Sequence, residues 1–231
     1  HPRHGLLAPG AFLAAMDQAN LRKLDLQMAQ AGVSECRKWL DHGCDLSVSV
    51  NASVATLQES GYADHVAEIA ARHRVPNASV MIEVVENQAV TESQQSMENL
   101  LRLRMKGFGL SIDDYGTGFS TLRQLTRVPF TEMKIDRMFV NGVSHKTDLR
   151  AVVESSLSMA RTLGLQVVGE GVETREDWDC LRDLGCPLAQ GYYFARPMDA
   201  GAFLQRVLAE RPDHGPVPAT SGDQTDHHRD R

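Results

Sequence analysis

The sequence lacks the features that mark a disulfide-stabilised or membrane-spanning protein. Its four cysteines include no C-x-x-C pair, and four are few for a disulfide scaffold in a chain of 231 residues. No apolar run approaches the roughly 20 residues that cross a bilayer, and there is no signal-peptide pattern. These absences favour the reducing cytoplasm and predict no membrane span in this chain.

An excess of positive charge is also missing. The formal net charge is -6, and no basic stripe is present that could follow a nucleic-acid backbone. We therefore expect no DNA or RNA polymer as a partner, although a small anionic ligand could bind through a metal ion. The composition, 42% hydrophobic and 23% charged, is that of a globular protein.

The two ends of the chain differ from its middle. The sequence starts with "HPRHGLLAPG", without an initiator methionine or the start of an element, which is typical of a piece cut from something longer. Residues 211–231 are rich in Pro, Gly, Asp and His, and they predict a disordered tail. Residues 1–210 are then expected to form one domain.

Short apolar runs alternate with amphipathic stretches between these ends. The apolar runs predict strands at 46–51, 79–86, 107–114, 132–136, 165–173 and 189–195. Helical spacing separates them, and Thr174 with Asp177 reads as a capping box at the start of one helix. Repeated strand-helix units predict an α/β fold with a parallel sheet, either doubly wound or closed into a barrel.

Polar residues at the ends of nearly all predicted strands favour the barrel. In a doubly wound sheet only the strands near the switch point need such endings, whereas a barrel gathers all its carboxyl ends around one mouth. The residues concerned are Asn51, Glu83, Glu86, Asp113, Asp114, Lys134, Asp136, Glu170, Glu173 and Gln190. The pattern therefore predicts a TIM-like (β/α) barrel with a polar mouth.

The chemistry of this mouth indicates a divalent cation site. Carboxylates and an amide suit Mg²⁺ or Mn²⁺ rather than zinc, because no His or Cys stands at ligand spacing. The adjacent Asp113 and Asp114 can be interpreted as ligands of two metals, the usual arrangement for hydrolysis of a phosphodiester. Taken singly, Glu173 or Asp136 would be a solvated charge or a helix cap, and Lys134 a simple ion-pair partner.

Six motifs together carry a family resemblance. They are "NAS" at 51, the glutamates at 83 and 86, "DDYGTGFSTL" at 113, "KIDRMFV" at 134, "GEGVET" at 169 and "AQGYYFARP" at 189. In this order and spacing they resemble an EAL domain, the bacterial phosphodiesterase that hydrolyses cyclic di-GMP. The resemblance implies a modified TIM barrel that opens cyclic di-GMP to linear pGpG with Mg²⁺ or Mn²⁺ in a two-metal site.

The resemblance also implies the metal ligands. Asn51, Glu83 and Asp113 match ligands, and Asp114 matches a ligand of the second metal. Glu170 matches the acidic residue beside the metal-bound water.

Further positions match residues that act around the metals. Lys134 matches the lysine that orients the water, and Asp136, Glu173 and Gln190 match supporting positions. Glu86 matches the glutamate that anchors the mobile loop after the paired aspartates.

The sequence departs from the family pattern in two places. The Glu-Ala-Leu strand that normally precedes "HP" is absent from this chain, and the E-x-T-E-S motif reads Glu83-Val84-Val85-Glu86-Asn87. An alternative therefore stays open, in which an inactive EAL domain acts as a cyclic di-GMP receptor or a protein-interaction module. The resemblance further implies an upstream regulatory domain in a parent protein and is compatible with a homodimer.

Overall fold

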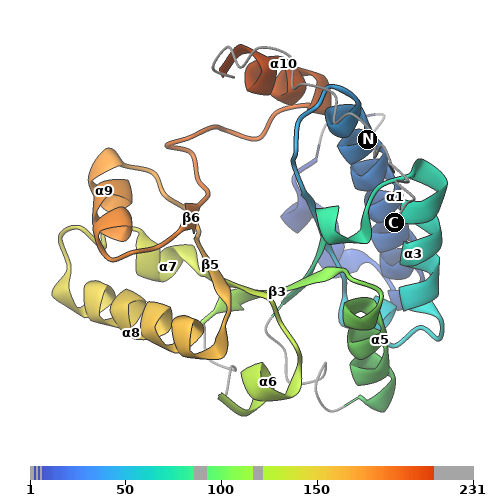
Figure 1. Cartoon of the computed structure of the whole chain (residues 1–231), viewed down its shortest axis with the longest axis horizontal. Coiled ribbons are helices and arrows are strands. Elements are labelled where there is room, and N and C mark those ends of the chain that lie inside the picture. Colours follow the sequence, from blue (N-terminus) through green and yellow to red (C-terminus); the bar gives the residue numbers. More distant parts are fainter. Residues whose placement is uncertain (1–2, 4, 6, 86–92, 117–121, 211–231) are drawn as a thin grey trace, which may run out of the picture. The chain divides into compact units, whose positions relative to one another are not determined.

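A computed structural model of the chain describes residues 3, 5, 7–85, 93–116 and 122–210, without the side chains of 122–124. Six parallel strands form one curved sheet, visible across the middle of Figure 1. They are β1 (Val48–Asn51), β2 (Val80–Val85), β3 (Gly109–Tyr115), β4 (Glu132–Ile135), β5 (Gln166–Gly169) and β6 (Leu188–Ala189).

The strands lie in the sheet in the same order as in the sequence. A doubly wound sheet would reverse its order at a switch point, so the sequential order agrees with the barrel alternative. In the described part of the chain, β1 and β6 each pair on one side only. The predicted TIM-like α/β fold is thus confirmed as a half-barrel of six strands.

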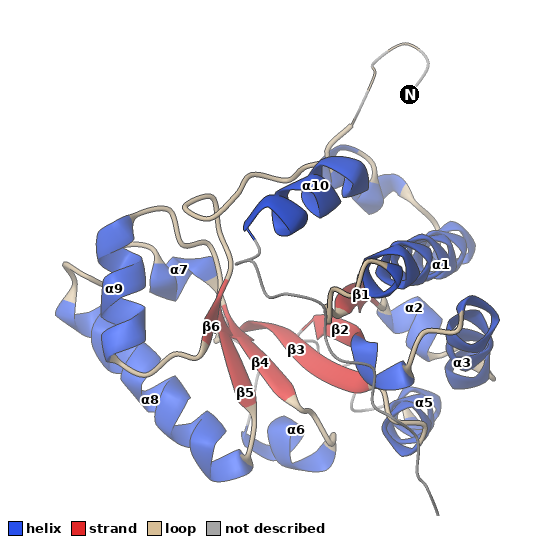
Figure 2. Cartoon of the chain, turned by 45° about the horizontal axis from the view of Figure 1, so that its top comes forward, coloured by secondary structure: helices blue, strands red, loops and turns tan. Residues whose placement is uncertain are grey.

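Helices of the first compact unit line the outside of this curved sheet, as Figure 2 shows. The helices of the first unit, residues 1–196, are α1 (Gln18–Asp41), α2 (Val54–Leu57), α3 (Tyr62–His73), α5 (Gln94–Met105), α6 (Leu122–Arg127), α7 (Arg137–Val140), α8 (Thr147–Leu163) and α9 (Arg175–Asp183), with short 3-10 turns at Pro9–Ala11, Leu13–Ala15 and Asn77–Ser79. A second unit begins at residue 197 and contains α10 (Ala200–Glu210). No helix among the described residues is both long and apolar enough to cross a membrane.

Alternation along the strands divides the sheet into an apolar and a polar face. Side chains on a strand point to opposite faces in turn, so Ile82 and Leu110 pack outward against the helices while Glu83 and Ser111 point inward. The apolar face continues in two clusters of buried side chains, one around α1, α3 and α5 and one around α7, α8 and α9. Each fully buried aliphatic side chain contributes about 1.5–3 kcal/mol. The two apolar clusters therefore stabilise the sheet whose inner face holds the polar side chains.

Two predicted strands extend well beyond the strands in the structure, whereas the described bounds of the other four lie within two residues of the prediction. The prediction 165–173 is wrong beyond Gly169, because Gly171 has a left-handed backbone (φ 68°) and lies against Arg137. The prediction 189–195 is wrong as well: β6 ends at Ala189, and a turn follows in which Phe194 N donates to Gly191 O over 3.1 Å. The predicted tail, 211–231, lies outside the described residues.

A buried aspartate joins α9 to the loop between α7 and α8. Thr174 caps α9 as predicted, accepting from Asp177 N over 3.2 Å. The Asp177 carboxylate in turn accepts from Ser144 Oγ (2.7 Å), Ser144 N (3.0 Å), Gly142 N (3.2 Å) and Thr174 Oγ1 (2.9 Å). Burial alone would raise the pKa of Asp177, but these hydrogen bonds outweigh it and hold that pKa below its usual value.

Asp177→Ala should lower the free energy of unfolding by about 2–4 kcal/mol, because it removes a buried carboxylate and leaves four partly buried hydrogen bonds unmade. The depressed pKa means that this contribution is present above about pH 4 and is lost as the pH falls through the folded-state value. Urea unfolding between pH 3 and 7 measures both effects. The difference in the free energy of unfolding between wild type and variant should become smaller as the pH falls below about 4.

Asp179→Ala on the same helix is the matched control. Among the described residues, Asp179 pairs with Arg175 (3.4 Å) and Arg182 (2.8 Å) at the surface, so its removal should lower the free energy of unfolding by less than about 1 kcal/mol. Equal losses in the two variants would show that the buried hydrogen bonds of Asp177 do not hold α9 in place.

Candidate metal centre

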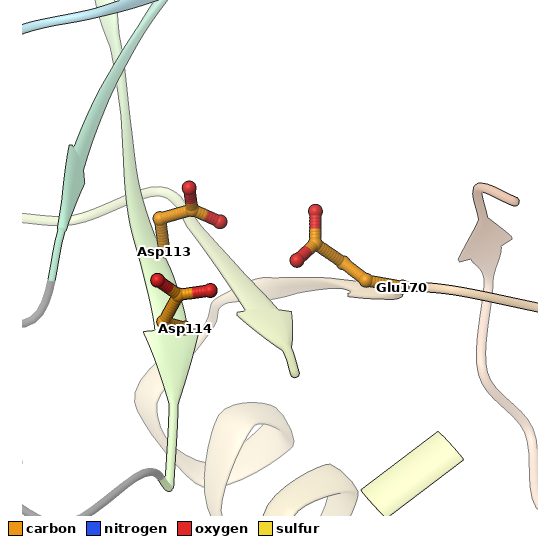
Figure 3. A group of neighbouring side chains, drawn as sticks. All are labelled: Asp113, Asp114 and Glu170. Carbon is orange, nitrogen blue, oxygen red and sulfur yellow. The ribbon is translucent and has the colours of Figure 1, made fainter. Parts of the chain in front are cut away.

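The end of β3 brings two adjacent aspartates to the same side of the sheet. Neighbouring residues on a regular strand point to opposite faces, so Asp113 and Asp114 would normally diverge. The pairing of β3 with β4 shifts register between Ile112 and Tyr115, and Asp114 has a left-handed backbone with φ 57°. Aspartate tolerates this conformation better than most residues. Both carboxylates consequently face Glu170, as Figure 3 shows.

A single lysine joins three of the predicted residues. Lys134 Nζ lies 2.6 Å from Glu170 Oε1, 3.1 Å from Glu83 Oε1 and 3.1 Å from Asp113 Oδ1. Its side chain is only 6% exposed, so these ion pairs are shielded from water. The ammonium therefore holds together carboxylates that come from β2, β3 and the residue after β5.

The burial of these charges shifts their pKa values. Burial lowers the pKa of Lys134, but the attraction of Glu83, Glu170 and Asp113 outweighs it, and the net pKa is raised. Burial raises the pKa of Glu170 to about 7, against the opposing effect of Lys134. Burial and the neighbouring Asp113 and Asp136 raise the pKa of Asp114. In the absence of metal, the site thus holds more negative charge than its lysine neutralises.

Strand pairing places Asn51 beside this group. Asn51 is the register partner of Glu83, so the two side chains leave the same face of neighbouring strands. The row continues through Ser111 to Glu132, which is buried although sequence reasoning did not select it. Burial raises the pKa of Glu132, against the opposing effects of the nearby Ser111 hydroxyl and the Lys134 ammonium. The sequence could have indicated this, because Glu132 stands two residues before Lys134 and the two-residue period of a strand puts both side chains on the inner face.

Backbone hydrogen bonds fix the segment that carries Glu170. Glu170 N donates to Ile135 O (3.0 Å), and Gln190 N donates to Gly169 O (2.9 Å). A Cβ at Gly191 would collide with the backbone of Val172, so only glycine permits this close approach. The Gln190 side chain then donates from Nε2 to Glu170 Oε1 over 3.3 Å.

The remaining predicted residues lie in different surroundings. Asp136 caps α7, accepting from Met138 N over 2.7 Å, and its carboxyl also contacts that of Asp114. Glu173 is exposed, and among the described residues it does not belong to the carboxylate group of Asp113, Asp114 and Glu170. Glu86 lies outside the described residues, so its role as a loop anchor stays a prediction.

The donor atoms fit a hard divalent cation. One carboxylate oxygen each from Asp113, Asp114 and Glu170 lie within 4.8 Å of one another. Asp113 Oδ1 is buried and accepts no hydrogen bond of good geometry from the described residues, although Lys134 Nζ is 3.1 Å away. An oxygen-only donor set with a buried, under-used oxygen is what Mg²⁺ or Mn²⁺ prefers.

Comparison with known proteins identifies two curated relatives in Pseudomonas aeruginosa. The curated cyclic di-GMP phosphodiesterase RocR of Pseudomonas aeruginosa is 38% identical over 205 residues, which are 88% of this chain and 52% of RocR. The bifunctional diguanylate cyclase/cyclic di-GMP phosphodiesterase MucR of the same organism is 37% identical over 209 residues, 90% of this chain and 30% of MucR. The chain thus spans about half or less of these relatives.

Solved structures resemble the fold closely. The MucR phosphodiesterase in complex with c-di-GMP has a TM-score of 0.81 at 37% identity, covering 88% of this chain and 83% of that one. Klebsiella pneumoniae BlrP1, in a manganese/cy-diGMP complex, has a TM-score of 0.74 at 29% identity, covering 82% of this chain and 48% of that one.

The profile of the EAL domain family matches residues 1–197, which include all the strands of the sheet and the carboxylates at their ends. Because this match spans most of the sequence, the chain belongs to the EAL domain family.

Proposed function

We propose that this chain hydrolyses cyclic di-GMP to linear pGpG, with Mg²⁺ or Mn²⁺ as cofactor. The observation that carries the proposal is the convergence of Asp113, Asp114 and Glu170 beside a buried lysine at the carboxyl ends of the strands. That is where barrel enzymes place their active sites. The names of RocR and MucR as cyclic di-GMP phosphodiesterases support the choice of substrate.

Five side chains would hold the metals. They are Asn51, Glu83, Asp113, Asp114 and Glu170. When bound there, the metals would supply Lewis acidity that activates water and neutralises charge on a phosphoryl oxygen. Hydrolysis joins the oxygen of water to phosphorus and breaks one phosphorus–oxygen ester bond, and the proton of the water ends on the leaving sugar oxygen.

Side chains of this protein would accept the proton and orient the group that accepts it. Glu170 lies beside Asp113 and Asp114, so its carboxylate would be placed to accept the proton of the attacking water. Lys134 donates to Glu170 Oε1 and keeps this carboxylate directed toward the aspartates, and Gln190 Nε2 donates to the same oxygen. We assign Asp136 and Glu173 to supporting roles, with Asp136 acting through its contact with Asp114.

The proposal also covers the parent protein, its location in the cell and its partners. A regulatory domain upstream in the parent protein would control the activity, since the chain spans only 30% of MucR and 52% of RocR. All four cysteines are free, which suits the proposed cytoplasmic location. We also propose that the protein forms a homodimer. We propose no DNA or RNA polymer as a partner.

The direct test measures cyclic di-GMP hydrolysis with Mn²⁺ or Mg²⁺, comparing this chain with a version extended upstream through a Glu-Ala-Leu strand. We expect turnover in the extended version, and loss of turnover with a chelator. Binding of the dinucleotide without cleavage in both versions would instead establish the receptor alternative.

Asp113→Asn and Asp114→Asn should each reduce turnover of the extended version by more than about 100-fold, because each removes a charged metal ligand. Asp148→Asn, at an exposed position in the first turn of α8, serves as the control and should leave turnover unchanged. Full turnover in either site variant would refute the two-metal assignment.

Lys134→Met should destabilise the metal-free protein by about 3–5 kcal/mol, since it leaves buried carboxylates without their cation. Saturating Mn²⁺ should recover part of the loss by replacing the missing positive charge. Urea unfolding with chelator and with Mn²⁺ measures both values, and the exposed Lys146→Met is the control. The same loss with and without Mn²⁺ would show that the metal does not occupy this carboxylate group.

A further inference from the structure

An aspartate on α1 reaches the segment that directly follows β1. Asp25 Oδ2 accepts one hydrogen bond from Ser53 N over 2.8 Å and another from Thr56 Oγ1 over 2.6 Å. Thr56 is buried, and its hydroxyl also lies 3.0 Å from Ser53 Oγ. Bonds to an ionised acceptor are about twice as strong as neutral ones, so this contact fixes the start of α2 firmly.

The fixed segment begins two residues after the proposed ligand Asn51. Asn51 ends β1, whose described pairing is with β2 alone. Ala52 N donates to Glu83 O over 2.8 Å, and Ser53 N donates to Asp25. The backbone after Asn51 is thus tied first to β2, which carries Glu83, and then to α1.

We propose that Asp25 is a positioning residue for the metal centre: it holds the backbone that aims the Asn51 side chain beside Glu83. This inference rests on the proposed function, because it takes Asn51 as a metal ligand. A polar partner beyond the ligands typically changes metal affinity about 10–100-fold when it is removed. Asp25 would act in this way through two residues of backbone, without touching the metal.

The chain offers a matched control at the other end of the same segment. Asn99 on α5 is fully buried, and its Nδ2 donates to Leu57 O and to Glu59 O, each over 2.8 Å. Asn99 therefore anchors the segment between α2 and α3, six to eight residues beyond Asn51. If Asp25 only stabilises the fold, Asp25 and Asn99 variants should behave alike.

The experiment measures Mn²⁺ affinity by titration calorimetry in the full chain, alongside urea unfolding. Asp25→Ala and Asn51→Ala should each weaken Mn²⁺ binding about tenfold or more, whereas Asn99→Ala should lower stability and leave the affinity unchanged. Asp25→Asn should retain most of the affinity, because an amide oxygen can accept the same two hydrogen bonds. Thr56→Val removes one of these bonds with little change in shape, and it should give an intermediate loss.

The outcomes separate this inference from the proposed function. Weaker binding in Asn51→Ala together with wild-type affinity in Asp25→Ala and Thr56→Val would overturn the positioning role alone. Wild-type affinity in Asn51→Ala would remove the metal role of Asn51, and the positioning role with it. If Asp25→Ala does not fold, Thr56→Val and Asp25→Asn decide the question in the same assay.

Discussion

The structure depends on one buried interaction, the contact of Lys134 with Glu83, Asp113 and Glu170. A buried ion pair gains little net stability, because the loss of hydration offsets the attraction between the charges. Here one ammonium faces three carboxylates, so the balance of charge stays negative. Such an arrangement is costly for a purely structural core, and it is reasonable where a divalent cation supplies the missing charge.

Apolar burial on the outer face of the sheet offsets the free-energy cost of burying charged groups on the inner face. Buried residues such as Ile82, Leu110 and Met133 pack against the helices, and the inner residues beside them in the sequence carry the chemistry. The strict alternation breaks at one place, where the register shift and the left-handed Asp114 turn a second carboxylate toward Glu170. The local strain at Asp114, of order 1–3 kcal/mol, is typical of functional sites, where surrounding structure enforces it.

Different contacts support the proposed ligands at the two sides of the site. On the β5 side, backbone hydrogen bonds and the close approach of Gly191 to Val172 hold Glu170 and Gln190 in register. On the β1 side, pairing with β2 leaves the other edge of the strand without a described partner, and α1 contributes Asp25 instead. The backbone beside the proposed metal centre is therefore held by a helix as well as by the sheet.

Much of this arrangement could be predicted from the sequence, and the exceptions share a physical cause. Apolar runs that end in Asn51, Glu83, Asp113 and Glu170 determine the parallel strands and the polar edge, because strand periodicity and strand direction are local properties of the chain. The short β6, the buried Glu132 and the contact of Asp25 with Ser53 were not predicted. Each depends on groups brought together from distant parts of the sequence.

The sequence by itself determined which residue types stand at the strand ends, and thereby the class of site. Only the tertiary structure decided that Asp114 turns to the same side as Asp113, that Lys134 reaches three carboxylates at once, and that Glu173 remains exposed. Local propensities cannot encode these outcomes, because they follow from the register between neighbouring strands and from the space that the packed helices leave.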